Sequence, residues 1–365
     1  MKIAIITMHR VLNYGSALQA YALQNTLLKL GYDNELINYV FLKQKKTSLK
    51  EHFYYLVCAL REFFRGNPIK NKRNRFNSFY CRYFKETSRV FYSENDLKEI
   101  GDMYDCYITG SDQVWNPIHI VDDTSYLLSF VNSEKKKISY ASSFSVTSLP
   151  DKEKNVFRKY LRQYTSISVR EFSGVKIVKD LLGVIPSVTC DPTLLVDEKS
   201  WRSIIPSTPL LVKGKYILVY ILKYAYNPFP YINEIIDDIA HRMGIPVVSI
   251  DTPYGLTINS KITNIRDAGP LEFLSLFLNA SFVITTSFHG TAFSLNFKKN
   301  FISVVSDDDK FDTRMRDLLK IVGAEDRMVI YNNYKTISTF VDYKDISLKL
   351  DVFKRKSLDF LETSL

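Results

Sequence analysis

The sequence has little cysteine and no long apolar run, and each shortage excludes a class of protein. Its four cysteines show no Cys-x-x-Cys spacing among its 365 residues, which argues against a disulfide framework or a zinc site. No apolar run approaches the roughly 20 residues that span a bilayer. The apolar start at Met1–Ile6 is too short for a signal peptide. We therefore expect no metal and a cytoplasmic location. The cysteines are Cys58, Cys81, Cys106 and Cys190.

The glycine-rich phosphate loops of common cofactor-binding enzymes are also missing. The chain contains neither Gly-x-Gly-x-x-Gly nor a Walker-type loop, although it has 13 glycines. These loops supply the backbone N–H groups that hold a dinucleotide or ATP in many α/β enzymes. We therefore expect no bound cofactor.

Alternating strand-like and helix-like segments fill both halves of the sequence and predict an α/β fold with parallel sheets. A proline-containing break at 203–214 separates the halves. We expect a Rossmann-like domain at 1–205, a second at 206–335, and a last helix within 336–365 that packs back on the first. The expected strands are 3–6, 35–39, 106–109, 137–141, 166–169, 188–190, 216–222, 246–250, 281–285 and 301–305. The expected helices are 17–30, 49–65, 72–84, 151–163, 171–182, 231–243, 270–278, 291–297, 311–322 and 343–361.

The positive charge is concentrated in one segment, residues 43–89. It contains 13 lysines or arginines and 3 glutamates, so its net charge of +10 equals that of the whole chain. Aromatic residues are interspersed with these cations. The segment is either a solvated helical pair with its aromatics in the core or a surface for anionic lipid. Nucleic acid is the least favoured partner, because no known nucleic-acid-binding motif accompanies the cations.

Two polar loops follow apolar strands about 180 residues apart. One carries Asp112 after Cys106–Thr109, and the other carries His289 after Phe282–Thr285. Ligands of open α/β sheets bind beyond the carboxyl ends of strands, so the two loops predict one cleft between two domains. Asp112 is either a base or a turn cap, and His289 is either an acid or base or a structural residue. Trp115 offers a flat face to a sugar ring, or packs in the core.

Three further motifs lie at predicted strand ends. The loop Asn13–Ser16 precedes a helix whose start suits an anion, although an ordinary strand-to-helix turn is the favoured interpretation of this loop alone. Arg170 either holds an anion or pairs with Glu171 at the surface. Asp191-Pro192 is best explained as a turn.

Five of these blocks together resemble the polysaccharide pyruvyl transferase family over about residues 1–325. They are Asn-Tyr-Gly-x-x-Leu-Gln-Ala-Tyr-Ala-Leu-Gln at 13–24, Gly-Ser-Asp-Gln-Val-Trp-Asn at 110–116, Ser-Val-Arg-Glu at 168–171, Asp-Pro-Thr at 191–193 and Ser-Phe-His-Gly at 287–290. The resemblance implies a fold similar to GT-B glycosyltransferases. It also implies transfer of the enolpyruvyl group of phosphoenolpyruvate to two hydroxyls of a sugar, with release of phosphate.

The resemblance also implies roles for individual residues. His289 and Asp112 would be catalytic: one would be the acid and the other the base, in either order. Arg170 would hold the donor substrate. Many relatives have an arginine where this chain has Ser287, and Arg314 is the preferred replacement over Arg266 or Lys298. The other expected donor-binding residues are Ser287, Gly290 and Thr291, and the expected acceptor-binding residues are Asn13, Tyr14, Gln113 and Trp115.

The expected acceptor is a sugar on a polyprenyl diphosphate, and segment 43–89 would approach the anionic inner face of the membrane. Two other functions remain open from the sequence. One is a nucleotide-sugar-dependent glycosyltransferase of the same architecture, and the other is a non-catalytic protein that docks carbohydrate or lipid.

Overall fold

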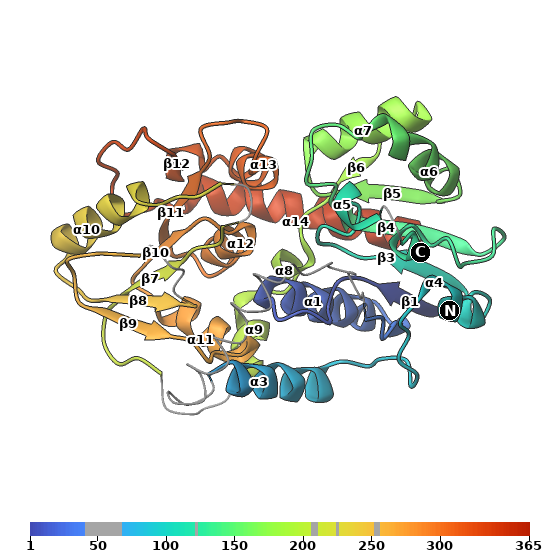
Figure 1. Ribbon diagram of the computed structural model, residues 1–365, viewed down its shortest axis with the longest axis horizontal. Helices are drawn as coiled ribbons and strands as arrows, with labels where there is room; N and C mark the ends of the chain where they lie inside the picture. The colour runs from blue at the N-terminus through green and yellow to red at the C-terminus, as the bar shows by residue number, and fades with distance from the viewer. Residues whose placement is uncertain (41–67, 121–122, 206–210, 224–225, 252–255) are drawn as a thin grey trace, which may run out of the picture.

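Two parallel six-stranded sheets, each covered by helices, form two Rossmann-like domains that lie side by side (Figure 1). The computed structural model describes residues 1–40, 68–120, 123–205, 211–223, 226–251 and 256–365. The central strands of both sheets are almost entirely buried, as expected for parallel sheets that are covered on both faces, whereas the edge strands are partly exposed. The α/β class and the two-domain architecture predicted from the sequence are confirmed.

The first sheet has the strand order β2-β1-β3-β4-β5-β6. Its strands are β1 (Lys2–Ile6), β2 (Asp33–Leu36), β3 (Cys106–Thr109), β4 (Lys136–Ser142), β5 (Ser166–Val169) and β6 (Ser187–Val188). Its helical segments are α1 (Tyr14–Lys29), α4 (Glu94–Leu97), α5 (Pro117–Ile120), α6 (Asp151–Leu161), α7 (Phe172–Leu182), α8 (Pro192–Leu195) and α9 (Glu198–Ile204). The chain leaves β1 toward one edge and returns to β3, so the topological switch point lies between β1 and β3.

The second sheet has the strand order β12-β11-β10-β7-β8-β9. Its strands are β7 (Ile217–Tyr220), β8 (Val247–Ile250), β9 (Ile262–Ile265), β10 (Phe282–Thr285), β11 (Asn300–Val305) and β12 (Met328–Ile330). Its helices are α10 (Tyr231–Met243), α11 (Pro270–Asn279), α12 (Phe288–Asn296) and α13 (Thr313–Val322). Here the switch point lies between β7 and β10.

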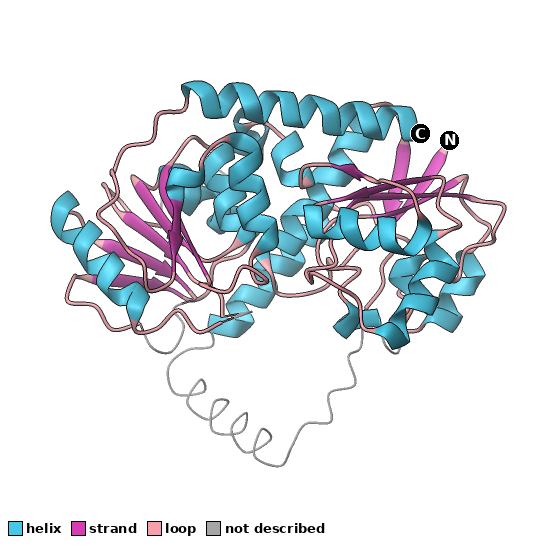
Figure 2. Cartoon of the chain, turned by 90° about the horizontal axis from the view of Figure 1, so that it is seen from above, coloured by secondary structure: helices cyan, strands magenta, loops and turns pink. Residues whose placement is uncertain are grey.

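The last helix, α14 (Lys344–Ser364), starts beside the second domain and ends on the first (Figures 1 and 2). The hydroxyl of Ser357 accepts a hydrogen bond of 2.8 Å from the backbone N–H of Cys190. Leu361 is fully buried among residues of the first sheet. The helix therefore ties the end of the chain to the first domain.

Helix α3 (Pro68–Tyr83) makes up most of the described part of the basic segment, 68–89, and it packs against α11 of the second domain. The Arg75 guanidinium donates to the carbonyl oxygen of Asp267 at 2.8 Å. Phe76, Phe79 and Tyr80 are buried, so these aromatics belong to the core. The other predicted helix of this segment, 49–65, lies outside the described residues.

Several short elements were not predicted, because their sequences carry little periodic signal. Strand β9 is mostly exposed, and β12 has only three residues. Helices α8 and α9 begin at Asp191 and Asp197, whose carboxylates cap them. Helix α12 starts at Phe288, earlier than predicted, because the Ser287 side chain caps it.

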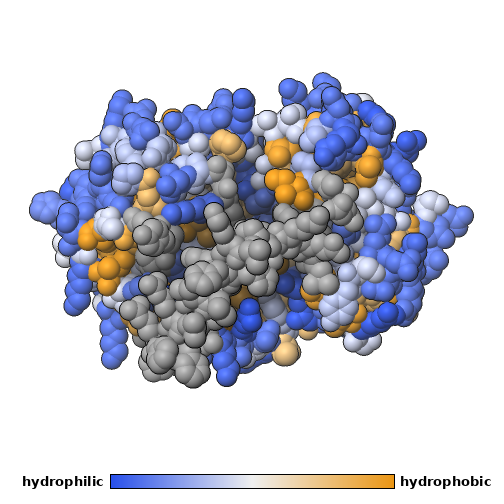
Figure 3. Space-filling model, viewed as in Figure 1, coloured by the Kyte–Doolittle hydropathy of each residue, from blue (hydrophilic) through white to orange (hydrophobic). Residues whose placement is uncertain are grey.

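Polar and apolar side chains are interspersed on the face shown in Figure 3. Within the described ranges, every helix is either too short or too polar to cross a bilayer.

A direct contact between the domains joins α13 to the start of α7. One Asp317 carboxylate oxygen accepts a hydrogen bond of 2.7 Å from the backbone N–H of Phe172. Burial raises the pKa of Asp317 to about 6, and nearby Glu171 also raises it, whereas the Phe172 N–H and Lys320 lower it. Ionised Asp317 at the domain boundary therefore destabilises the folded state, and this destabilisation grows as pH rises through about 6.

Replacing Asp317 with asparagine should make the protein more stable than the wild type at neutral pH but not at acidic pH. The folded state binds the Asp317 proton more tightly than the unfolded chain, whose aspartates have a pKa near 3.9. The wild-type residue therefore contributes most stability below about pH 4 and loses it as pH rises through about 6. Between about pH 4 and pH 7, we expect the unfolding free energy of Asp317→Asn to rise relative to that of the wild type by roughly 1 kcal/mol, a value reduced for the partial exposure of the side chain. Thermal unfolding across this range checks this, with Asp180→Asn on the exposed face of α7 as control. Identical pH dependence in both variants would contradict it.

Candidate active site

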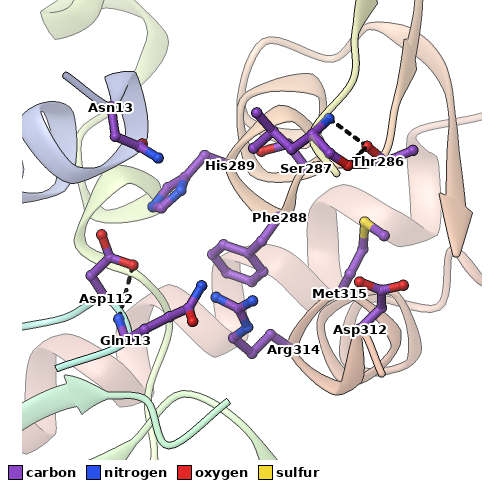
Figure 4. Close-up of a pocket in the computed structure, with 11 residues that line it drawn as sticks. Asn13, Asp112, Gln113, Thr286, Ser287, Phe288, His289, Asp312, Arg314 and Met315 are labelled. Atoms are coloured by element: carbon purple, nitrogen blue, oxygen red, sulfur yellow. Dashed lines mark hydrogen bonds between the residues drawn. The ribbon is translucent and has the colours of Figure 1, made fainter. Parts of the chain in front are cut away.

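A pocket between the two domains lies at the carboxyl ends of both sheets (Figure 4). Its lining comes from the loops after β1 and β3 in the first domain and after β7 and β10 in the second. These four strands flank the two topological switch points, where open α/β sheets bind ligands. The start of α13 completes the pocket. The lining residues are Asn13, Asp112, Gln113, Leu222, Thr286, Ser287, Phe288, His289, Asp312, Arg314 and Met315.

His289 belongs to the second domain, but its imidazole lies against the first. The Ser287 hydroxyl accepts a hydrogen bond of 3.3 Å from the Gly290 N–H, which fixes the first turn of α12 and hence His289. In the first domain, the ring packs on the backbone of Gly15. A Cβ atom at Gly15 would meet three ring atoms, and even the farthest of them, Cε1, would lie only 2.5 Å away. Gly15 thus makes room for the imidazole.

Asp191 lies behind the imidazole, and its carboxylate is completely buried. Its Oδ2 is 3.5 Å from His289 Nε2 and accepts hydrogen bonds from Arg170 Nη1 at 2.7 Å and from the Ser111 hydroxyl at 2.9 Å. Its Oδ1 accepts from the backbone N–H and the hydroxyl of Thr193. Burial alone would raise the pKa of Asp191, but His289 and Arg170 hold it well below its usual range. Asp191 is therefore a carboxylate and accepts hydrogen bonds only.

Asp112 lies in the turn after β3 with a positive φ of 80°, a conformation that aspartate tolerates better than most residues. The Ser16 hydroxyl donates to its Oδ2 at 2.5 Å, and Arg170 Nη2 is 3.8 Å from its Oδ1. Burial would raise the pKa of Asp112, but His289 and Arg170 lower it, as do the Ser16 hydroxyl and Arg314. Asp112 is thus an ionised acceptor, and Figure 4 shows it beside the imidazole.

Arg170 joins the two carboxylates beneath the pocket. Its guanidinium is buried, and its carbon lies 4.4 Å from the centre of the Phe288 ring of the second domain. Within the described residues, its Nε and Nη2 have no hydrogen-bond partner. Buried donors without hydrogen bonds are costly, so these two atoms are candidates for contact with a polar ligand or water, although Arg170 itself does not line the pocket.

Arg314 reaches the pocket from α13 and meets Gln113 of the first domain. With the amide oxygen of Gln113 turned toward it, Arg314 donates from Nη1 at 3.1 Å and from Nη2 at 3.2 Å. Burial and nearby Arg170 lower the pKa of Arg314, but a guanidinium stays charged at any physiological pH. Arg266 and Lys298, the two alternative cations, are exposed and do not line the pocket.

Two predicted acceptor residues lie away from the pocket. Trp115 is fully buried in the first domain, where its indole N–H donates to the carbonyl of Tyr126 at 3.1 Å. The Tyr14 hydroxyl donates to Asp251 at 2.7 Å, and its ring stacks on Phe273 with centroids 4.7 Å apart. Trp115 therefore packs in the core, and Tyr14 joins the two domains.

Two residues that were predicted to bind the donor substrate, Gly290 and Thr291, support α12 and do not line the pocket. The Thr291 hydroxyl donates to the Ser287 carbonyl at 3.1 Å and lies 2.7 Å from the Ser303 hydroxyl. A Cβ at Gly290 would overlap the Thr285 side chain, so glycine allows α12 to pack closely on β10. Of the remaining predicted residues, Asn13, Gln113 and Ser287 do line the pocket.

The structure places at the site residues for which the sequence predicted no site role. Ser16 contacts Asp112, and Phe288 stacks on Arg170. The sequence predicts a turn at Asp191-Pro192, and Asp191 does cap α8, but its carboxylate also lies beside His289. The side chains of Asp312 and Met315 reach the pocket because α13 is packed beside α12, which no local pattern reveals. Across the described ranges, no group of three or more His, Cys, Asp or Glu side chains is arranged to hold a metal ion.

Solved structures with a similar fold include several sugar-nucleotide enzymes. A Listeria monocytogenes protein described as a UDP-N-acetylglucosamine 2-epimerase is 11% identical, with a TM-score of 0.53 and coverage of 99% of this chain and 90% of that one. Staphylococcus aureus MnaA bound to UDP is 9% identical, with a TM-score of 0.52 and the same coverages. At such low identities the likeness shows the fold alone, which is that of GT-B glycosyltransferases and epimerases.

No curated protein sequence matches the chain. By contrast, the family model described as polysaccharide pyruvyl transferase matches residues 13–308, most of the chain. The matched range starts at the Asn13 loop and includes His289, Asp112, Arg170 and Asp191. This protein therefore belongs to the polysaccharide pyruvyl transferase family.

Proposed function

We propose that this protein transfers the enolpyruvyl group of phosphoenolpyruvate to two hydroxyls of one sugar, forming a cyclic pyruvate ketal and releasing phosphate. One observation carries the proposal: buried Arg170, with two unpartnered donor atoms, lies next to the ionised Asp112 and the imidazole of His289. The site thus combines a place for an anion with groups that exchange protons.

Phosphoenolpyruvate carries a carboxylate and a phosphate, and two guanidinium groups lie at or near the pocket. Arg314 lines it, whereas Arg170 is buried behind the lining residues. Guanidinium groups bind carboxylates and phosphates through paired hydrogen bonds. The first turn of α12, capped by Ser287, adds the partial positive charge of a helix start. Arg314 compensates for the absence of an arginine at position 287, because both positions line the same pocket.

The proposed reaction needs a proton donor, a base and stabilisation of charge. Protonation of the donor's methylene carbon makes C2 electrophilic, and a sugar hydroxyl bonds to C2 as its own proton moves to a base. A second hydroxyl then forms the second C–O bond to C2 as the bond to phosphate breaks, and the proton of this hydroxyl passes to the departing phosphate. His289 and Asp112 lie side by side and supply the acid and the base. Arg170 and Arg314 stabilise the phosphate as it leaves.

The decisive experiment incubates the protein with phosphoenolpyruvate and a panel of aryl and lipid-linked glycosides. We expect one acceptor to gain the mass of pyruvate less one water, with one phosphate released per transfer. His289→Gln should abolish both signals. A thermal-shift comparison with sugar nucleotides serves as a counter-test. If a sugar nucleotide stabilises the protein and phosphoenolpyruvate does not, the protein is a glycosyltransferase. Without transfer or stabilisation by any donor, it is a carbohydrate- or lipid-docking protein.

We further propose that the acceptor is linked to a polyprenyl diphosphate and that segment 43–89 contacts an anionic membrane surface from the cytoplasmic side. Helix α3 supports this proposal: it carries no acidic residue, and its Arg73 and Arg82 are exposed. Lysine and arginine near such a surface each contribute about 1 kcal/mol.

Replacing Arg73 and Arg82 with glutamine should weaken binding to anionic vesicles by about 2 kcal/mol, or roughly 30-fold. Flotation with vesicles that contain phosphatidylserine measures the effect, and neutral vesicles give the baseline. A matched control replaces Lys152 and Arg162, two exposed cations of the α6 region. Equal loss in both double variants, or equal binding to neutral vesicles, would contradict the proposal.

A further inference from the structure

The two ring nitrogens of His289 lie in opposite electrostatic surroundings. Nε2 points to the carboxylate of Asp191 at 3.5 Å, whereas Nδ1 lies over Gly15 in the first turn of α1, which has 16 residues. The amino-terminal turn of a helix carries partial positive charge. Nε2 therefore faces a carboxylate oxygen, and Nδ1 faces the amino-terminal end of a helix.

A neutral imidazole has one N–H and one lone pair, and these surroundings decide which nitrogen has which. The oxygens of Asp191 already receive hydrogen bonds from Arg170, Ser111 and Thr193, so the carboxylate can only accept. A lone pair on Nε2 would face a negative oxygen and would be repelled. A proton on Nδ1 would face the positive end of α1. Both effects favour the tautomer with the proton on Nε2.

Nε2 is buried and has no hydrogen-bond partner within the described residues. A separation of 3.5 Å is longer than an ordinary hydrogen bond. Catalytic hydrogen bonds are often long before substrate binds and shorten in the complex. The Nε2–H group would move toward Asp191, because the Oδ2 atom of this carboxylate lies 3.5 Å from Nε2.

We infer that Asp191 is a positioning residue that keeps the proton of His289 on Nε2, so that protons exchanged with substrate pass through Nδ1. Asp191 follows β6 in the first domain, and His289 lies on α12 of the second. The carboxylate thus orients an imidazole supplied by the other domain. The inference deepens the proposed function and rests on it for the reaction served, but it can be tested without substrate.

The test is nitrogen NMR of the full chain labelled with 15N-histidine. The chain has five histidines, and His289→Gln identifies the signals of His289. In the wild type at a pH where the imidazole is neutral, we expect two-bond 1H–15N correlations typical of the Nε2–H tautomer. In Asp191→Asn, an amide that can donate or accept replaces the carboxylate, so a mixture of tautomers should appear. Asp197→Asn, an equivalent change at the cap of α9, should leave the spectrum as in the wild type.

Kinetics give a second readout. With phosphoenolpyruvate, Asp191→Asn should lower kcat roughly 100-fold or more, with KM changed less than about threefold, because the loss concerns proton transfer. An Nδ1–H tautomer in the wild type would overturn the inference, even if the variant fails to fold. So would an unchanged tautomer and kcat in a folded Asp191→Asn. If the wild type shows the Nε2–H tautomer and the variant shifts it, but no pyruvyl transfer occurs, the proposed function fails and the role of Asp191 stands.

Discussion

Gly15→Ala should abolish the proposed pyruvyl transfer and leave the protein folded. The added methyl group would overlap the imidazole of His289, whose ring atoms lie where the Cβ would be. Helix α1 is held by contacts with the first sheet and with the second domain, so the His289 side chain has to give way. A misplacement of about 1 Å in a catalytic group costs roughly 100-fold in rate. We expect kcat/KM to fall by at least that factor.

The matched control is Gly31→Ala, just beyond the other end of α1. Gly31 has a φ of +86°, and an added Cβ would meet nothing within 4 Å. This variant should lose about 1 kcal/mol of stability through backbone strain and keep its activity per folded molecule. Kinetics with phosphoenolpyruvate, together with thermal unfolding of both variants, check the pair. Wild-type activity in Gly15→Ala would show that the imidazole does not work from the observed position.

Arg170→Met should produce the largest loss of stability that we predict. Arg170 lies between two carboxylates, with Nη1 2.7 Å from Asp191 and Nη2 3.8 Å from Asp112. Both acids are buried and ionised, and removing the guanidinium leaves their charges poorly compensated. Breaking a buried ion pair in this way costs about 3–5 kcal/mol. Chemical denaturation at neutral pH measures the change in the free energy of unfolding.

Two comparisons separate this effect from general damage. Arg202→Met removes an exposed pair with Glu198, four residues earlier on α9, and should cost well under about 1 kcal/mol. Adding Asp191→Asn to Arg170→Met should restore part of the lost stability, because one uncompensated charge disappears. Strictly additive losses in the double variant would contradict an electrostatic origin.

Most of the fold follows from local patterns in the sequence. Strands such as Phe282–Thr285 are continuous apolar runs, and helices such as Tyr231–Met243 show apolar residues at helical spacing. The elements that were missed depend on tertiary contacts. Strand β9 has one apolar residue at each end and forms only because its backbone pairs with β8 at the sheet edge.

The candidate site could be predicted only in part. Asp112 and His289 were found because each follows a strand, and strand ends are where ligands bind. Trp115 also lies near a strand end, but its large apolar ring is buried in the core. Its position in the sequence does not distinguish a buried ring from one that lines the pocket. The pairing of Asp191 with His289 joins residues almost a hundred positions apart, and only the docking of the two domains brings them together.

The chain joins the two domains at two places. The polypeptide passes from the first domain to the second between α9 and β7, and it returns through α14. Because both crossings are covalent, the two halves of the pocket belong to one molecule, and bringing them together is an intramolecular event. The imidazole of His289 therefore meets Asp191 at an effective concentration that does not depend on the concentration of the protein.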